Sequence, residues 1–176
     1  SLYYYHLNET AKIRYIQLDS NETEIMYSEP EKGLINKVSK EQMEWLINLL
    51  QNESLDYDTV IVSHVPVIKS LAMPIDLLEP VRIILNAYQS KVSGSVTVEG
   101  KSLSFNFENT SSRILFVLCG HTHRDLSMYA DGILHITIPC DARYPNDGIL
   151  RGLGTVNESC FDVCLVDNSD KNKVLY

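Results

Sequence analysis

Two short apolar runs, each closed by a histidine motif, set the strongest limit on the fold of this chain. The first run is Thr59-Val60-Ile61-Val62, and Ser63-His64 follows it directly. The second is Ile114-Leu115-Phe116-Val117-Leu118-Cys119, and Gly120-His121-Thr122-His123 follows it. Uninterrupted apolar runs of this kind are typical of strands covered on both faces, as in the parallel sheets of α/β proteins. We therefore expect an α/β fold in which both histidine motifs lie at the carboxyl ends of core strands.

The segments around these runs predict further strands and helices of the same sheet. Residues 2–7 and 12–19 predict two strands joined by a turn. Ser39 and Gln42 form an N-cap and capping-box pair at the start of an amphipathic helix that ends near Asn52. The other expected elements are a helix within 74–91, a hairpin over 95–107, and strands over 133–138, 161–166 and 173–176. With 176 residues, no linker and no internal repeat, the chain is expected to form one domain over residues 1–176.

Histidines are concentrated where the two core strands are expected to end. His64, His121 and His123 are three of the five histidines in the chain, and neutral imidazole is an efficient ligand for zinc, manganese and iron. Gly120 precedes the second pair, and a residue without a Cβ tolerates backbone conformations that would turn both rings toward one cavity. We predict that His64, His121 and His123 are metal ligands and that Gly120 shapes their site.

The remaining histidines and the four cysteines do not predict a second site. His6 and His135 are expected to be ordinary strand residues, with His135 on the less buried face of its strand. No Cys-x-x-Cys pair occurs, which disfavours a structural zinc site. Cys119 and Cys140 each follow an apolar run and are expected to be buried as small hydrophobic residues. Four cysteines also permit disulfides, so the sequence leaves the cellular compartment open.

Charge and hydropathy argue against two classes of interaction, namely nucleic-acid binding through phosphate contacts and membrane insertion. The formal net charge is −8 and the sequence pI is about 5.0, whereas binding to nucleic acid through phosphate contacts requires clustered Lys and Arg. No apolar run approaches the roughly 18 residues of a membrane span, and no signal-peptide pattern is visible. We therefore expect a soluble protein with no strong nucleic-acid signal and no membrane span.

At this point the chain resembles a known family. Ser63-His64 and Gly120-His121-Thr122-His123, with the flanks Val117-Leu118-Cys119 and Arg124-Asp125, are similar to the last two motif blocks of the calcineurin-like metallophosphoesterases. The helix ending near Asn52 and the stretch Gly152-Leu153-Gly154-Thr155-Val156 also resemble bacterial and phage-type members. The resemblance implies a four-layer α/β/β/α sandwich with two mixed sheets, and hydrolysis of phosphate mono- or diesters with two divalent ions (manganese, iron or zinc). It also implies that His64 and His121 bind one ion and His123 the other.

The sequence departs from the family at its earlier motif blocks. An Asp-x-His, a Gly-Asp and a Gly-Asn-His block supply most metal ligands and the proton donor in the family, and none of them occurs here. We therefore expect this chain to be the C-terminal half of a longer phosphoesterase, with no complete catalytic set of its own. Histidines without an anionic ligand are predicted to bind at most one metal ion, weakly, and not to turn over phosphate esters. Exposed sheet surface is expected to favour a homodimer.

Two other functions remain compatible with the sequence. One is a non-catalytic phosphoesterase-like module that binds a partner through its sheet. The other is a mononuclear zinc protein, since three histidines and a water can form a zinc site. Upstream sequence with or without the aspartate and Gly-Asn-His blocks separates the first alternative from an active parent enzyme. Metal analysis with a His123→Ala control tests the second.

Overall fold

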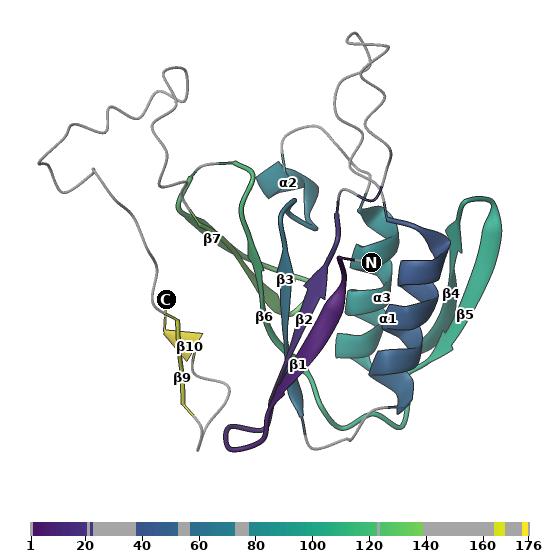
Figure 1. Ribbon diagram of the computed structural model, residues 1–176, viewed down its shortest axis with the longest axis horizontal. Coiled ribbons are helices and arrows are strands. Elements are labelled where there is room, and N and C mark those ends of the chain that lie inside the picture. The colour runs from purple at the N-terminus through teal and green to yellow at the C-terminus, as the bar shows by residue number, and fades with distance from the viewer. Residues whose placement is uncertain are drawn as a thin grey trace, which may run out of the picture.

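The computed structural model describes residues 2–20, 22, 38–52, 57–72, 78–122, 124–138, 164–167 and 174–175. Its centre is a six-stranded mixed sheet with the strand order β1-β2-β3-β6-β8-β7 (Figure 1). The strands are β1 (Tyr4–Asn8), β2 (Ile13–Leu18), β3 (Asp58–Ser63), β6 (Ile114–Cys119), β7 (Leu126–Ala130) and β8 (Ile133–Thr137). β2, β3, β6 and β8 are parallel, and the edge strands β1 and β7 run antiparallel to their neighbours. The expected α/β class with a mixed sheet is confirmed.

The two longer helices cover one face of this sheet, and a hairpin covers the helices (Figure 1). The helices are α1 (Lys40–Asn52) and α3 (Glu79–Ser90), with a short α2 (Lys69–Ala72) after β3. The hairpin consists of β4 (Ser93–Val98) and β5 (Lys101–Asn106), and its two turn residues, Glu99 and Gly100, both have positive φ, as a two-residue hairpin turn requires. Phe107 follows β5 and contacts Tyr88 of α3 edge to face, with ring centroids 5.3 Å apart.

The sheet has an apolar core on each of its faces. Residues that alternate along one strand belong to different cores, as Val60 and Ile61 of β3 and Phe116 and Val117 of β6 do. The helix-side core is the larger one and includes α1, α3 and the hairpin. The core on the other face comprises Ile13, Val60, Leu115, Phe116, Leu134 and Ile136, and partly buried Cys164 and Val166 pack against it. Burial on both faces explains why the two core strands are apolar without alternation.

A buried arginine joins α1 to the sheet. Arg14 is 1% exposed, and its guanidinium donates to the hydroxyl of Thr59 on the neighbouring strand and to the carbonyl oxygen of Leu49 at 3.0 Å. Leu49 lies in the last turn of α1, where carbonyl groups have no partner within the helix and the helix dipole favours a cation. Arg14 therefore fixes where the helix ends over β2 and β3.

Most expected elements occur with small shifts of their ends, and β7 is the main omission. Four of the five residues of β7 are exposed. Because neither face of this strand is buried, its sequence does not need the alternation of apolar and polar residues from which a half-buried strand is predicted. The last two expected strands are described as β9 (Leu165–Val166) and β10 (Val174–Leu175). Within the described ranges, no helix is long and apolar enough to cross a membrane.

Candidate metal centre

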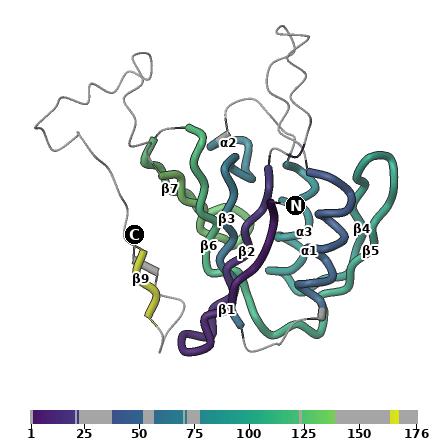
Figure 2. The backbone as a smooth tube through the Cα atoms, viewed as in Figure 1, coloured from purple at the N-terminus to yellow at the C-terminus, as the bar shows by residue number. Residues whose placement is uncertain are grey.

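The two histidine motifs meet at one edge of the sheet, where β2, β3 and β6 end. Ser63 and Cys119 are paired at the ends of β3 and β6, and the loops that follow emerge beside α2 (Figure 2). One further hydrogen bond continues this pairing, because the N–H of Gly120 donates to the carbonyl oxygen of His64 at 3.0 Å. The strand register therefore places the residues after β3 beside those after β6.

The rings of His64 and His121 are direct neighbours. Their centroids are 5.4 Å apart and their planes are nearly perpendicular, at 83°. His64 is exposed and His121 is half-buried, so water and ions reach the pair. Two residues separated by 57 positions in the chain thus contribute imidazoles to one place on the surface, as the ends of adjacent parallel strands allow.

The turn that directs His121 depends on a different residue from the one expected. His121 has a positive φ of 68°, whereas Gly120 is not among the residues with positive φ. The N–H of Thr122 donates to the carbonyl oxygen of Gly120 at 2.8 Å, which makes residues 120–122 a γ-turn centred on the histidine. The explanation that Gly120 supplies the unusual backbone conformation is therefore wrong. A side-chain-bearing residue takes the left-handed position, at a local energetic cost of about 1–2 kcal/mol.

Gly120 still lies against the histidine pair. A Cβ placed on it would be 3.5 Å from the Nδ1 of His64 and 3.7 Å from the carbonyl oxygen of the same residue. These are ordinary van der Waals separations, so a small side chain at position 120 meets the His64 ring without a clash. Gly120 is thus a neighbour of the His64 ring, and the prediction that it shapes the site is open to test by Gly120→Ala.

The spacing of the two rings fits a shared metal ion. Two imidazoles bound to one tetrahedral ion, with nitrogen–metal distances of about 2.0–2.1 Å, have ring centroids about 5 Å apart. The observed 5.4 Å is close to this value. Among the described residues, no group of three or more His, Cys, Asp or Glu side chains could hold one ion. His123 and residues 152–156 lie outside the described residues.

Hydroxyl groups hold the backbone that carries His64, and the sequence alone did not indicate them. The hydroxyl of Ser63 donates to the carbonyl oxygen of Val65 at 3.0 Å, and the N–H of Val65 donates to the hydroxyl of Ser20 at 3.2 Å. Both serines are 2% exposed. Their signal in the sequence is weak, because each is simply a polar residue at or just after the end of a strand.

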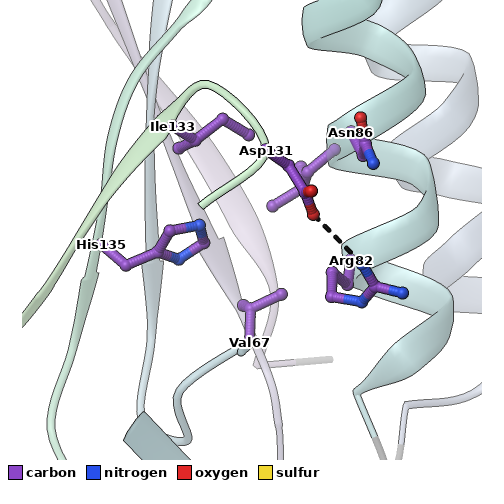
Figure 3. A pocket seen from close by; sticks show the side chains of 7 residues that line it. Val67, Arg82, Asn86, Asp131, Ile133 and His135 are labelled. Atoms are coloured by element: carbon purple, nitrogen blue, oxygen red, sulfur yellow. Dashed lines mark hydrogen bonds and ion pairs between the residues drawn. The ribbon is translucent and has the colours of Figure 1, made fainter. Parts of the chain in front are cut away.

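His135 occupies a very different place, in the middle of β8. It is 3% exposed, and burial lowers the pKa of its imidazole to about 4, with Asp131 acting weakly in the opposite direction. The expectation that it lies on the less buried face of its strand is therefore wrong, since α3 covers that face. Its ring points into a small cavity that Val67, Arg82, Leu85, Asn86, Asp131 and Ile133 also line (Figure 3). Its Nδ1 has no hydrogen-bond partner in the part of the chain that the structure describes.

The charges around this cavity are already paired. Arg82 contacts Asp131 at 3.1 Å and also forms an ion pair with Glu79. The dashed line in Figure 3 marks the first of these contacts, which joins two residues that line the cavity. Neither His64 nor His121 lines the cavity, so it is separate from the candidate metal centre.

No protein-family model matches the chain, and no curated protein matches it. The chemistry of the site therefore has to be inferred from its own residues.

Proposed function

We propose that this chain forms the C-terminal part of a calcineurin-like, metal-dependent phosphoesterase that hydrolyses phosphate mono- or diesters at a two-metal site. The observation that carries the proposal is the His64–His121 pair, whose ring centroids lie 5.4 Å apart at the ends of adjacent parallel strands. The Gly-His-Thr-His motif after β6 supports the same reading, because it provides a second histidine, His123, two residues after the first.

The three histidines divide between the two metal ions in this proposal. His64 and His121 hold one divalent ion as neutral imidazoles, and His123 contributes to the second. Two such ions lower the pKa of a bound water and neutralise charge on the phosphoryl oxygens. The residues of this chain supply the position of the ligands, through the strand register, the γ-turn at His121 and the hydroxyl groups of Ser20 and Ser63.

The chain alone is proposed to be inactive. Two divalent ions held close together require anionic ligands to compensate their charge, and the described residues offer no carboxylate clustered with the two histidines. We therefore propose that the chain binds at most one ion, weakly, and that upstream residues of a longer protein complete the site. A phosphate ester is the substrate of the complete enzyme in this proposal.

The second apolar core supports the finer fold proposal, the four-layer sandwich. Among the described residues, α1 and α3 lie on one face of the sheet, and the other face carries its own apolar cluster around Val60 and Phe116. A second sheet packed on that cluster would give the sandwich. The members of that cluster are themselves buried, so the homodimer proposed from the sequence rests on no exposed apolar surface there, and sedimentation over a range of concentrations tests it.

The proposal is tested by assays of bis-p-nitrophenyl phosphate and p-nitrophenyl phosphate hydrolysis with Mn²⁺. The chain alone is expected to show no turnover. A longer protein that includes the residues encoded before Ser1 is expected to hydrolyse at least one of the two substrates. His64→Ala and His121→Ala should abolish that activity, and His6→Ala, which changes an exposed histidine of β1, should not. An active longer protein whose rate is unchanged by His64→Ala and His121→Ala would refute the proposal.

A mononuclear zinc protein is the second candidate, because the spacing of the His64 and His121 rings suits one tetrahedral ion in this case as well. It predicts one tightly bound zinc per chain without any upstream residues. Elemental analysis of the purified chain, with His123→Ala as the comparison, distinguishes it from the phosphoesterase proposal, which predicts weak binding.

A further inference from the structure

The peptide bond between His64 and Val65 is held from both sides by other loops. Its carbonyl oxygen, on His64, accepts a hydrogen bond from the Gly120 N–H at 3.0 Å. Its N–H, on Val65, donates to the Oγ of Ser20 at 3.2 Å. Ser20 is 2% exposed and Val65 is 1% exposed, so water competes little for this bond. Because the Cα of His64 lies in the plane of this peptide, fixing both polar groups of the peptide also fixes where that Cα lies.

Ser20 is itself held by a side chain from α1. The N–H of Asp19 donates to the Oε1 of Gln42 at 2.8 Å, and the Nε2 of Gln42 donates back to the carbonyl oxygen of Asp19 at 2.9 Å. Gln42 is fully buried. These two bonds fix the backbone of Asp19, and the peptide bond between Asp19 and Ser20 passes this constraint to the serine.

This use of Gln42 differs from the expected capping box. Ser39 caps α1, since its Oγ accepts from the Gln42 N–H at 3.1 Å. The reciprocal half is missing, because the carboxylate of Glu22 accepts from the Ser39 N–H at 2.6 Å and from the Gln42 Nε2 at 2.7 Å. The Gln42 side chain is therefore directed to the loop after β2 instead of to its own helix terminus. Ser39 caps the helix without the Gln42 side chain, whose hydrogen bonds instead hold the loop after β2, near His64.

We propose that Ser20 and Gln42 are positioning residues for the metal ligand His64. The connection runs from the first turn of α1 to the loop after β2 by two part-buried hydrogen bonds between Gln42 and Asp19. It continues through the Asp19–Ser20 peptide bond and reaches the loop after β3 by the buried hydrogen bond from Val65 to Ser20. Removal of the Ser20 hydroxyl leaves the Val65 N–H buried without a partner and frees one side of the His64–Val65 peptide. This inference rests on the proposed function, because it assigns a role to residues that support one of its ligands.

Nuclear magnetic resonance of the histidine rings tests the proposal on the chain itself. Mn²⁺ broadens the signals of rings that bind it, so the Mn²⁺ concentration that halves the His64 signal reports ligand quality without any assay of activity. Ser20→Ala is expected to raise this concentration by about 10-fold, within the range typical for loss of a group that orients a ligand. Ser20→Thr keeps the Oγ and should restore the wild-type response. Gln42→Met should have the same effect as Ser20→Ala, but smaller.

The matched control is Thr110→Ala. Thr110 is 8% exposed, and its hydroxyl donates to the carbonyl oxygen of Phe107 at 2.8 Å, just before the amino end of β6 and away from the histidine pair. The Thr110→Ala substitution therefore removes a buried hydroxyl without changing the loops that follow β2, β3 and β6. Amide hydrogen exchange of Val65 adds a readout that needs no metal, and it is expected to accelerate in Ser20→Ala and not in Thr110→Ala.

The outcomes separate this inference from the function on which it rests. If the wild-type rings respond to Mn²⁺ and Ser20→Ala responds at the same concentration as Thr110→Ala, the positioning role is wrong and the ligand assignment stands. If His64 and His121 of the wild type do not respond, both are wrong. Should Ser20→Ala fail to fold, Gln42→Met provides the same comparison, and an unchanged response in that variant overturns the proposal.

Discussion

Histidine occupies two very different environments around the same sheet. One environment holds His64 and His121, and the other holds His135. The first two follow the ends of β3 and β6, where their rings are accessible and 5.4 Å apart. His135 lies within β8, is 3% exposed and has no hydrogen-bond partner for its Nδ1 among the described residues. The two environments are separated by only a few residue positions along the neighbouring strands β6 and β8.

This difference shows that the position of a histidine relative to the end of its strand determines whether its ring is buried or is accessible to a metal ion. Within a strand, the neighbouring strands and α3 surround the ring, and burial keeps it neutral by lowering its pKa to about 4. Beyond the strand end, the backbone turns, and rings from two loops can approach the same ion. A histidine within the sheet affects stability through its protonation, whereas one at the edge is available as a ligand.

The largest expected effect is the loss of metal binding when an edge histidine is removed. His64→Ala and His121→Ala should each weaken Zn²⁺ binding by more than about 100-fold, because loss of a ligand exceeds the 10–100-fold loss typical for groups that merely orient one. Titration calorimetry measures the affinity, and His6→Ala serves as the exposed control. Equal affinities in all three variants would remove the distinction between edge histidines and other exposed histidines.

The next effect concerns the stability of the fold at acidic pH. The pKa of His135 is about 4 in the folded protein and about 6.5 in an unfolded chain. Between these values the unfolded chain binds a proton that the folded chain does not, so stability falls as pH falls from about 6.5 to 4, by up to roughly 3 kcal/mol. His135 makes no contribution to the pH dependence above this window.

Urea unfolding at pH 7 and pH 4.5 measures this loss. His135→Leu should lose less stability than the wild type between the two pH values, because the other titrating groups are shared and cancel in the comparison. Parallel losses in the wild type and His135→Leu would show that His135 is not the group responsible.

A third prediction separates backbone strain from ligand function at His121. Its φ of 68° is unfavourable for a residue with a Cβ, so His121→Gly should raise the free energy of unfolding by about 1 kcal/mol while it removes a ligand. Glu99→Gly makes the same change at another position with positive φ, 52°, in the hairpin turn, and should stabilise the protein without affecting metal binding. If His121→Gly lowers the free energy of unfolding in the absence of metal, the claim that the backbone at His121 is strained is wrong.

The smallest effect is expected at Gly120. Because its φ is not left-handed and a Cβ would be 3.5 Å from the nearest His64 atom, Gly120→Ala should change the free energy of unfolding by no more than about 0.5 kcal/mol. Zn²⁺ binding should change just as little. A strong loss of binding in this well-folded variant would instead show that Gly120 shapes the site by leaving room for the His64 ring.

These comparisons also show what could be predicted from the sequence. The apolar runs of β3 and β6 predicted buried parallel strands, and hence that the residues after them would meet. The identity of the left-handed residue was not predictable, because the γ-turn depends on a hydrogen bond between Thr122 and Gly120. Alternation placed His135 in a strand, but which face is buried depends on α3, whose packing no local pattern specifies.

Long-range hydrogen bonds set the other limit of prediction. Ser20 and Val65 are 45 positions apart, and Asp19 and Gln42 are 23 apart. Each of these residues has an ordinary local explanation, as a loop serine or as part of a helix cap. Their role becomes visible when the sheet brings the loops after β2 and β3 together at one edge.

The central claim is that His64 and His121 bind the same metal ion, and the most direct measurement is a substoichiometric Mn²⁺ titration followed by the ring signals of the histidines. The paramagnetic ion should broaden the signals of His64 and His121 together, at the same concentrations, while the signals of His6 and His135 persist. Broadening of His64 and His121 that is no greater than that of His6, or that occurs at clearly different Mn²⁺ concentrations for the two rings, would contradict the claim.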